Sequence, residues 1–278
     1  MIVRLFLAIL ALAMPVAISA APASAKSDHC RVIGGLESLW SRPSLRWIIV
    51  GEVHGTAEMP AVFRDIVCNA AAAKRPIVVA VERSETEQAD IDAFMRSGRE
   101  AEARTALLKG YMWQNKAMQD GRNSRAYLQL LEDLRVMHRG GVIGRVVAFQ
   151  PAVRTHDAAS YEAEMAKRLQ SASPDEKTLV LAFVGNCHAM RIPMCGSKSA
   201  AGDLPRAETF TIDVEGSGGS VWNCGPDCGV HKVYGPSPIG SPRLDVIEDP
   251  RAPYDAMLFL GGPVTASLPA AGQVEVTP

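Results

Sequence analysis

The apolar positions of this chain form short runs that alternate with helical patterns of apolar and polar residues. The runs at 47–50, 77–81, 142–149 and 179–184 predict buried strands. Between them, apolar residues recur at the three- to four-residue spacing of amphipathic helices. The predicted helices cover 60–70, 86–97, 100–108, 123–138 and 157–171. This strand–helix order predicts an α/β fold, with a mostly parallel central sheet flanked by helices.

The last third of the chain has a different pattern. Short strands are predicted at 209–214, 230–234 and 256–260, the last two at a sheet edge. Residues 216–219 predict a flexible turn, and residues 224–243 are rich in Gly, Pro and Cys. We therefore expect a disulfide-rich C-terminal edge or cap on the same domain, followed by a mobile tail at 268–278.

The first 25 residues are typical of a secretory signal peptide. A short positive segment at 1–4 precedes the apolar run 5–20, and the small residues 23–25 fit a cleavage site. An uncleaved anchor is the alternative, but the apolar run is short for a membrane span. We expect a single domain over 26–267, periplasmic or secreted, without stable membrane insertion.

The six cysteines all follow the predicted signal peptide. They are Cys30, Cys68, Cys187, Cys195, Cys224 and Cys228. An even number in an oxidising compartment favours disulfides over metal thiolates. Proximity in the sequence suggests the pairs Cys187–Cys195 and Cys224–Cys228, which leaves Cys30 to pair with Cys68. Zinc binding by Cys224 and Cys228 is the alternative interpretation.

The charge of the chain is balanced and excludes one class of partner. The 29 basic residues nearly match the 30 acidic ones, for a net charge of −1, and no basic block stands out. Nucleic acid is therefore not an expected partner, and the expected ligand is a small molecule.

Three of the predicted strands end in ionisable residues beside a turn. Glu52 and His54 follow the first strand, Glu82 and Arg83 the second, and His188 the last. The carboxyl ends of parallel strands share one edge of the sheet, and ligands bind there. These side chains are therefore expected to meet in one cleft, as a catalytic or binding set.

The spacing of these residues suggests their roles. A histidine at a strand end acts as base, acid or ligand, because its ordinary pKa lies near working pH. Glu52 lies two residues before His54, on the same strand face, where it orients the imidazole or binds a metal with it. Glu82 follows an apolar run, so its carboxylate must be paired or have a raised pKa. Arg83 is the nearest candidate, although adjacent strand residues point to opposite faces.

Structural interpretations of the same residues remain open. His54 is also consistent with a polar residue at a turn, and Glu82 with a surface salt bridge. Glu58 suits the positive end of the following helix. Tyr111 and Trp113 line a pocket or pack in the core.

Missing motifs narrow the chemistry. The sequence has no Gly-x-Ser-x-Gly elbow, His-Glu-x-x-His helix, Gly-x-Gly-x-x-Gly fingerprint or phosphate-binding loop. Serine esterases, zincins, dehydrogenases and nucleotide hydrolases are disfavoured. The remaining chemistry is His/Glu activation of water, either directly or through a metal.

The three strand-end motifs together resemble a known superfamily. Gly-Glu-x-His-Gly-Thr, Glu-Arg and Gly-Asn-x-His-Ala occur in order over residues 45–190, and the segment 254–261 is also similar to bacterial members. The pattern resembles the erythromycin esterase/ChaN-like/Tiki (TraB-type) superfamily, in an exported bacterial form. That group includes macrolide-hydrolysing esterases, haem-binding lipoproteins and metalloproteases. The resemblance implies an α/β fold with paired histidines in one cleft.

One stretch departs from the family pattern. Members often carry Arg-Asp-x-x-Met-Ala on the helix before the last motif. The corresponding residues 161–166 of this chain keep an acid at Glu162 but lack the arginine.

Two functions follow as hypotheses. The first is an exported hydrolase of ester, lactone or amide bonds, with His54 as general base and Glu52 and Glu82 orienting it or helping to bind a divalent metal. Arg83 or His188 stabilises the oxyanion. The second is a periplasmic haem- or metal-binding protein without turnover, with His54, Glu52 and His188 as candidate ligands. A structural domain without an active site is the third alternative.

Overall fold

The computed structural model describes residues 30–116, 119–152, 157–193, 196, 198–224, 227–235 and 238–271. The predicted signal peptide lies outside the described residues, as do Cys195 and most of the predicted tail.

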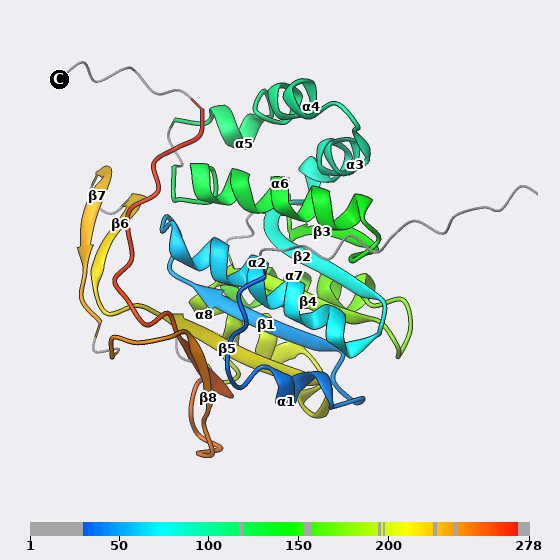
Figure 1. The fold of residues 1–278 in the computed structure, drawn as a ribbon, viewed down its shortest axis with the longest axis vertical. Helices are drawn as coiled ribbons and strands as arrows, with labels where there is room; N and C mark the ends of the chain where they lie inside the picture. The colour runs from blue at the N-terminus through cyan, green and yellow to red at the C-terminus, as the bar shows by residue number, and fades with distance from the viewer. Residues whose placement is uncertain are drawn as a thin grey trace, which may run out of the picture.

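The central sheet has the strand order β3-β2-β4-β1-β5-β9-β8 (Figure 1). Its strands are β1 (Trp47–Glu52), β2 (Ile77–Ser84), β3 (Arg145–Gln150), β4 (Leu179–Gly185), β5 (Thr209–Glu215), β8 (Arg243–Val246) and β9 (Ala256–Phe259). All neighbours pair in parallel except β8, which pairs antiparallel to β9. The predicted α/β fold with a mostly parallel sheet is confirmed.

The helices cover both faces of this sheet. They are α1 (Glu37–Trp40), α2 (Glu58–Ala70), α3 (Gln88–Arg96), α4 (Glu100–Leu107), α5 (Tyr111–Gln114), α6 (Arg125–Arg139), α7 (Ala158–Ala172) and α8 (Asn186–Ala189), with 3-10 turns at Ala71–Ala73, Glu85–Glu87, Ala201–Asp203 and Arg206–Glu208. Alternate residues of the strands contribute to two hydrophobic cores, one on each face of the sheet. Ile48 and Val50 pack with α2 and α6 on one face, and Trp47 and Ile49 pack with α7 on the other.

The C-terminal third differs from the expectation. Residues 230–234 were expected at a sheet edge, but the structure pairs β7 (Cys228–Val233) with β6 (Gly219–Cys224) in a separate two-stranded hairpin. The expected edge position is wrong because β6 begins at Gly219, inside the predicted turn, and supplies a nearer partner. Figure 1 shows this hairpin beside the C-terminal segment, which bridges to it at Val264.

Three smaller differences concern element boundaries. Helix α2 begins at Glu58 rather than Pro60, and a short helix occupies the predicted loop at 111–114. Strand β2 extends to Ser84, so Glu82 and Arg83 lie within the strand and not after it.

Two disulfides are present among the described residues. Cys30 bonds to Cys68 of α2, and Cys224 bonds to Cys228 across the tip of the hairpin. Both pairs were predicted, and Cys224–Cys228 confirms a disulfide in the C-terminal third. In the part of the chain that the structure describes, no helix combines the length and apolar character needed to cross a membrane.

Candidate active site

Two histidine–glutamate pairs lie at the carboxyl edge of the sheet. β1 and β4 are adjacent and parallel, with Glu52 opposite Gly185, so the segments that follow them emerge side by side. Nδ1 of His54 lies 2.8 Å from Oε1 of Glu52. Nδ1 of His188 lies 2.5 Å from Oε1 of Glu162, a residue of α7. A carboxylate therefore fixes Nδ1 of each imidazole and leaves Nε2 for other contacts.

Glu82 lies between the two histidines. Its Oε2 is 3.3 Å from Nε2 of His54 and accepts a 2.7 Å hydrogen bond from the Gly185 amide. Its Oε1 is 3.9 Å from Nε2 of His188. A Cβ on Gly185 would lie 3.0 Å from Nε2 of His54, so this position has little room for a side chain. The structure thus brings His54, Glu82 and His188 together, as the parallel sheet predicted.

Arg122 supplies the countercharge of Glu82. Its Nη1 lies 2.7 Å from Oε1 of Glu82, and its Nε and Nη2 bind Asp120. Both residues lie on the turn just before α6, whose first turn is capped by the Ser124 hydroxyl. Nothing in the local sequence around Arg122 and Asp120 marks a site, so neither residue could be predicted.

Arg83 lies on the opposite face of β2 from Glu82. Its Nε and Nη2 donate to Glu87 at 2.6 and 2.8 Å, and its Nη1 donates to the carbonyl of Arg122 at 2.6 Å. Its guanidinium stacks on Trp113 at 4.4 Å, and the residue is 1% exposed. Arg83 therefore binds the backbone of Arg122 from the face of β2 opposite Glu82. Its N–H groups point away from the histidines.

Glu162 is the acidic residue that this chain keeps from the family motif at residues 161–166. It lies on α7, and its Oε2 accepts a 2.7 Å hydrogen bond from the amide of Ala200. This second bond fixes the carboxylate that holds His188. The position of Glu162 within the family motif was the only sequence signal for it.

The charges around His54 set its protonation. Burial by itself favours the neutral imidazole, but the Glu82 charge and the hydrogen bonds to Glu52 and Glu82 outweigh it and raise the pKa of His54 to about 10. Burial likewise opposes ionisation of Glu82, but Arg122 and His54 hold its pKa well below the usual range. Burial raises the pKa of Glu52, whose Oε2 has no hydrogen-bond partner among the described residues. At neutral pH Glu82 is therefore negative and His54 positive.

The surroundings of His188 also favour its charged form. Burial lowers the pKa of His188, but the hydrogen bond to Glu162 and the charge of Glu82 outweigh it, so the pKa is raised. The nearest carboxylate oxygen to its Nε2 is the one on Glu82, at 3.9 Å, beyond hydrogen-bond distance. This N–H is the group best placed to donate to a bound molecule.

A cavity of about 300 Å³ opens beside Glu82, Arg122 and His188. Its other lining residues are uncharged: Ser84, Thr86, Tyr111, Met112, Asn115, Gln150, Pro151, Ala152 and Tyr161. Tyr111 is 75% exposed and lies at the rim, whereas Trp113 is buried in the core. The cavity has the size of a small-molecule site, with its charged groups gathered at one side.

Glu58 joins two elements of the fold. Its Oε2 accepts a 2.7 Å hydrogen bond from the amide of Thr265, which links α2 to the C-terminal segment.

The expected metal ligands do not form a donor set. Across the described ranges, no group of three or more His, Cys, Asp or Glu side chains is arranged to hold a metal ion. Nδ1 of His54 is engaged with Glu52 and Nδ1 of His188 with Glu162, and the shared Glu82 is paired with Arg122. Nε2 of His54 and Nε2 of His188 lie 3.3 and 3.9 Å from Glu82.

Comparisons with known proteins identify the fold. No family profile and no curated protein sequence matches the chain. Among solved structures, a succinoglycan biosynthesis protein is similar at a TM-score of 0.61 and 8% identity, covering 84% of this chain and 91% of that one. An erythromycin esterase variant in its open conformation is similar at 0.59 and 10%, covering 82% and 92%. A protein from Bacillus cereus is similar at 0.53 and 10%, covering 84% and 92%. At these identities the comparisons show that the chain has an erythromycin esterase-type fold.

Proposed function

We propose that this protein is an exported hydrolase that cleaves an ester, lactone or amide bond of a small molecule, with His54 as the general base. The observation that carries the proposal is the position of His54 between two buried carboxylates, Glu52 and Glu82, beside a second carboxylate-held histidine. An imidazole held at Nδ1 by a carboxylate is the arrangement that general-base catalysis uses, and Nε2 of His54 lies 3.3 Å from Glu82, which lines the cavity.

In the proposed reaction, Nε2 of His54 takes a proton from water while the water oxygen attacks the substrate carbonyl carbon. Glu52 holds the opposite nitrogen and stabilises the imidazolium that forms. The tetrahedral intermediate then collapses, the bond to the leaving oxygen or nitrogen breaks, and His54 returns the proton to the leaving group. An ester gives a carboxylic acid and an alcohol, an amide gives a carboxylic acid and an amine, and a lactone opens to a single hydroxy acid.

The developing oxyanion needs a donor, and His188 supplies it. Its Nε2 faces the cavity while Glu162 fixes its Nδ1. Arg122 offsets the charge of Glu82, so that this carboxylate repels the oxyanion less. Arg83, the other candidate from the sequence, acts in this scheme only through the backbone of Arg122.

The class and location of the enzyme rest on separate observations. The fold likeness to erythromycin esterase supports a hydrolase. The Cys30–Cys68 and Cys224–Cys228 disulfides support export, because such bonds persist in oxidising compartments.

The test is a screen of purified wild-type protein against panels of esters, lactones and amides, followed by His54→Asn on any substrate found. The variant should lose at least about 100-fold in kcat/KM, as expected for loss of a general base, and should keep the wild-type circular dichroism spectrum. His138→Asn is the matched control, because His138 lies near the end of α6, where its Nδ1 is 3.3 Å from the Ile143 carbonyl.

Two outcomes contradict the proposal. Full activity in His54→Asn excludes His54 as the base. A haem absorption band or a stoichiometric metal in the wild-type protein, lost in His54→Asn and unaccompanied by turnover, indicates the binding function instead.

A further inference from the structure

The β6–β7 hairpin reaches from the C-terminal third to two segments of the candidate site. We propose that Trp222 of this hairpin is a positioning residue, which fixes the Asp120–Arg122 turn and the Gly55 carbonyl that follows His54, and that the Cys224–Cys228 disulfide holds Trp222 in place. The catalytic part of this inference rests on the proposed hydrolase, whereas the positioning part rests on geometry alone.

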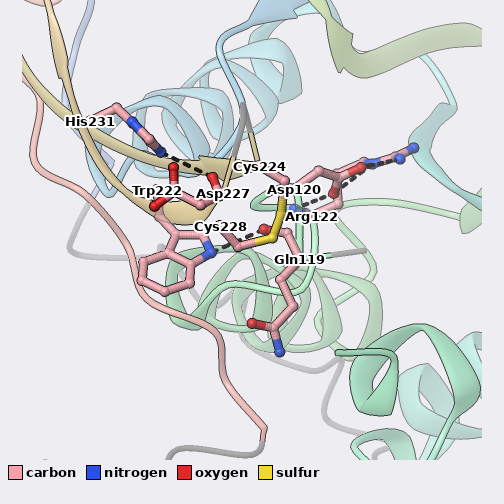
Figure 2. The surroundings of a disulfide bond; sticks show 8 residues. All are labelled: Gln119, Asp120, Arg122, Trp222, Cys224, Asp227, Cys228 and His231. Atoms are coloured by element: carbon pink, nitrogen blue, oxygen red, sulfur yellow. Dashed lines mark hydrogen bonds and ion pairs between the residues drawn. A yellow bond between two sulfur atoms is a disulfide. The ribbon is translucent and has the colours of Figure 1, made fainter. Parts of the chain in front are cut away.

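The first contact is between the Trp222 side chain and the Arg122 turn. The indole Nε1 donates a 3.0 Å hydrogen bond to the carbonyl of Gln119 (Figure 2). The next residue, Asp120, binds the Arg122 guanidinium, and Arg122 binds Glu82 at 2.7 Å. Three successive contacts therefore lead from the indole to the carboxylate that lies between the two histidines.

The second contact is between backbones. The amide of Trp222 donates a 3.0 Å hydrogen bond to the carbonyl of Gly55, directly after His54. The approach is so close that a Cβ on Gly55, where φ is +88°, would lie 1.8 Å from the Trp222 carbonyl oxygen. A Cβ on Gly121, where φ is +97°, would lie 2.2 Å from the amide nitrogen of Gly55. The hairpin, the His54 turn and the Arg122 turn are thus packed backbone against backbone, where only glycine fits.

The disulfide closes the end of the strand that carries Trp222. Cys224 lies two residues after Trp222 and opposite Cys228 in the ladder, so the bond ties the tip of the hairpin together. Only two strands make up this sheet, and an isolated two-stranded hairpin is marginally stable in water. A covalent link at its tip is a physical reason for Trp222 to keep one position.

Hydrogen–deuterium exchange of the full chain tests the positioning without any substrate. In Trp222→Phe, the amides of residues 119–124 should exchange about fivefold faster, the factor expected for one lost hydrogen bond. Residues 54–56 should keep the wild-type rate, because the backbone amide of residue 222 still donates to Gly55. Trp47→Phe is the matched control, because its indole also donates a 3.0 Å bond to a carbonyl, that of Leu169, but on the α7 face. It should leave both segments at the wild-type rate.

The double variant Cys224→Ser/Cys228→Ser tests the same contacts with Trp222 intact. It should accelerate exchange in both segments, and it decides the question if Trp222→Phe fails to fold. Wild-type exchange rates at residues 119–124 in a folded Trp222→Phe or in the double variant would overturn the proposal.

Kinetics on a substrate from the screen test the catalytic part. Trp222→Phe should lower kcat about fivefold or more with little change in KM, because Trp222 does not line the cavity and its indole acts on the orientation of Arg122. Faster exchange with unchanged kcat would overturn the catalytic part. If the screen finds no hydrolysis at all, the hydrolase proposal fails, and the exchange result still decides the positioning.

Discussion

At the scale of single residues, the site is a series of hydrogen bonds and ion pairs between buried side chains. His54 lies between Glu52 and Glu82, and Glu82 is shared with Arg122. Because burial removes water from these groups, each depends on its neighbour for its charge state. The protonation of His54 is therefore a property of the whole cluster.

The pH dependence of the rate follows from this cluster. Glu82 and Glu52 favour the imidazolium and raise the pKa of His54 to about 10, and a general base must first lose that proton. We expect kcat/KM to rise with pH towards about 10. In Glu82→Gln the rise should move to lower pH, because the main charge that holds the proton is gone. A pH–rate profile of both proteins is the measurement. A rate that falls over the same range would mean that the imidazolium acts as an acid instead.

At the scale of elements, the second histidine depends on a helix as well as on a strand. His188 lies on the short helix α8, directly after β4. Glu162 lies on α7, which packs on the face of the sheet, and its carboxylate contacts His188. Ala200 fixes the same carboxylate through its amide. The packing of α7 on the sheet therefore decides the direction of the His188 ring.

Replacing the helix residue should weaken catalysis without unfolding the protein. In Glu162→Gln, His188 loses its charged partner, and we expect kcat to fall about tenfold, less than the roughly 100-fold typical of losing an oxyanion donor outright. The control is Glu164→Gln on the same helix, because Glu164 pairs with Lys167 and Arg168 near the surface and not with a histidine of the site. Steady-state kinetics of the two variants check this. Equal effects in both would show that α7, and not the Glu162 carboxylate, is responsible.

At the scale of the whole molecule, the site joins segments that lie far apart in the chain. Strands β1, β2 and β4, the turn before α6, helix α7 and the β6–β7 hairpin all contribute to it. Its ion pairs therefore form only in the folded state, and they contribute to folding stability.

The stability of the fold should accordingly depend on alkaline pH. The pKa of His54 is raised from 6.5 to about 10, so the folded state holds this proton longer than the unfolded state does. The contribution is fully present below pH 6.5 and is lost as pH approaches 10, at no more than about 1.4 kcal/mol per pH unit for one proton. Urea unfolding of wild type and His54→Gln across this range measures it. The free energy of unfolding of wild type should fall more steeply with pH, and parallel curves would contradict the assignment.

The local sequence predicted much of the fold, since the apolar runs and helical spacings in the first two thirds each became a strand or helix of the same type. It predicted less of the last third, because β6 is built around glycines and a tryptophan whose pairing depends on a partner strand. In the site, the sequence also placed Glu82 after a strand, whereas the structure keeps it inside β2.

The sequence by itself determined that His54, Glu82 and His188 lie near one another, because each follows or ends an apolar strand and parallel strands finish at one edge. Only the tertiary structure decided which groups complete them. Arg122 and Trp222 come from a turn and a hairpin whose local sequences carry no distinguishing pattern, and Glu162 comes from a helix where only the family motif marked it. Arg83, adjacent to Glu82 in the chain, faces away from the histidines, because consecutive side chains of a strand project to opposite faces of the sheet.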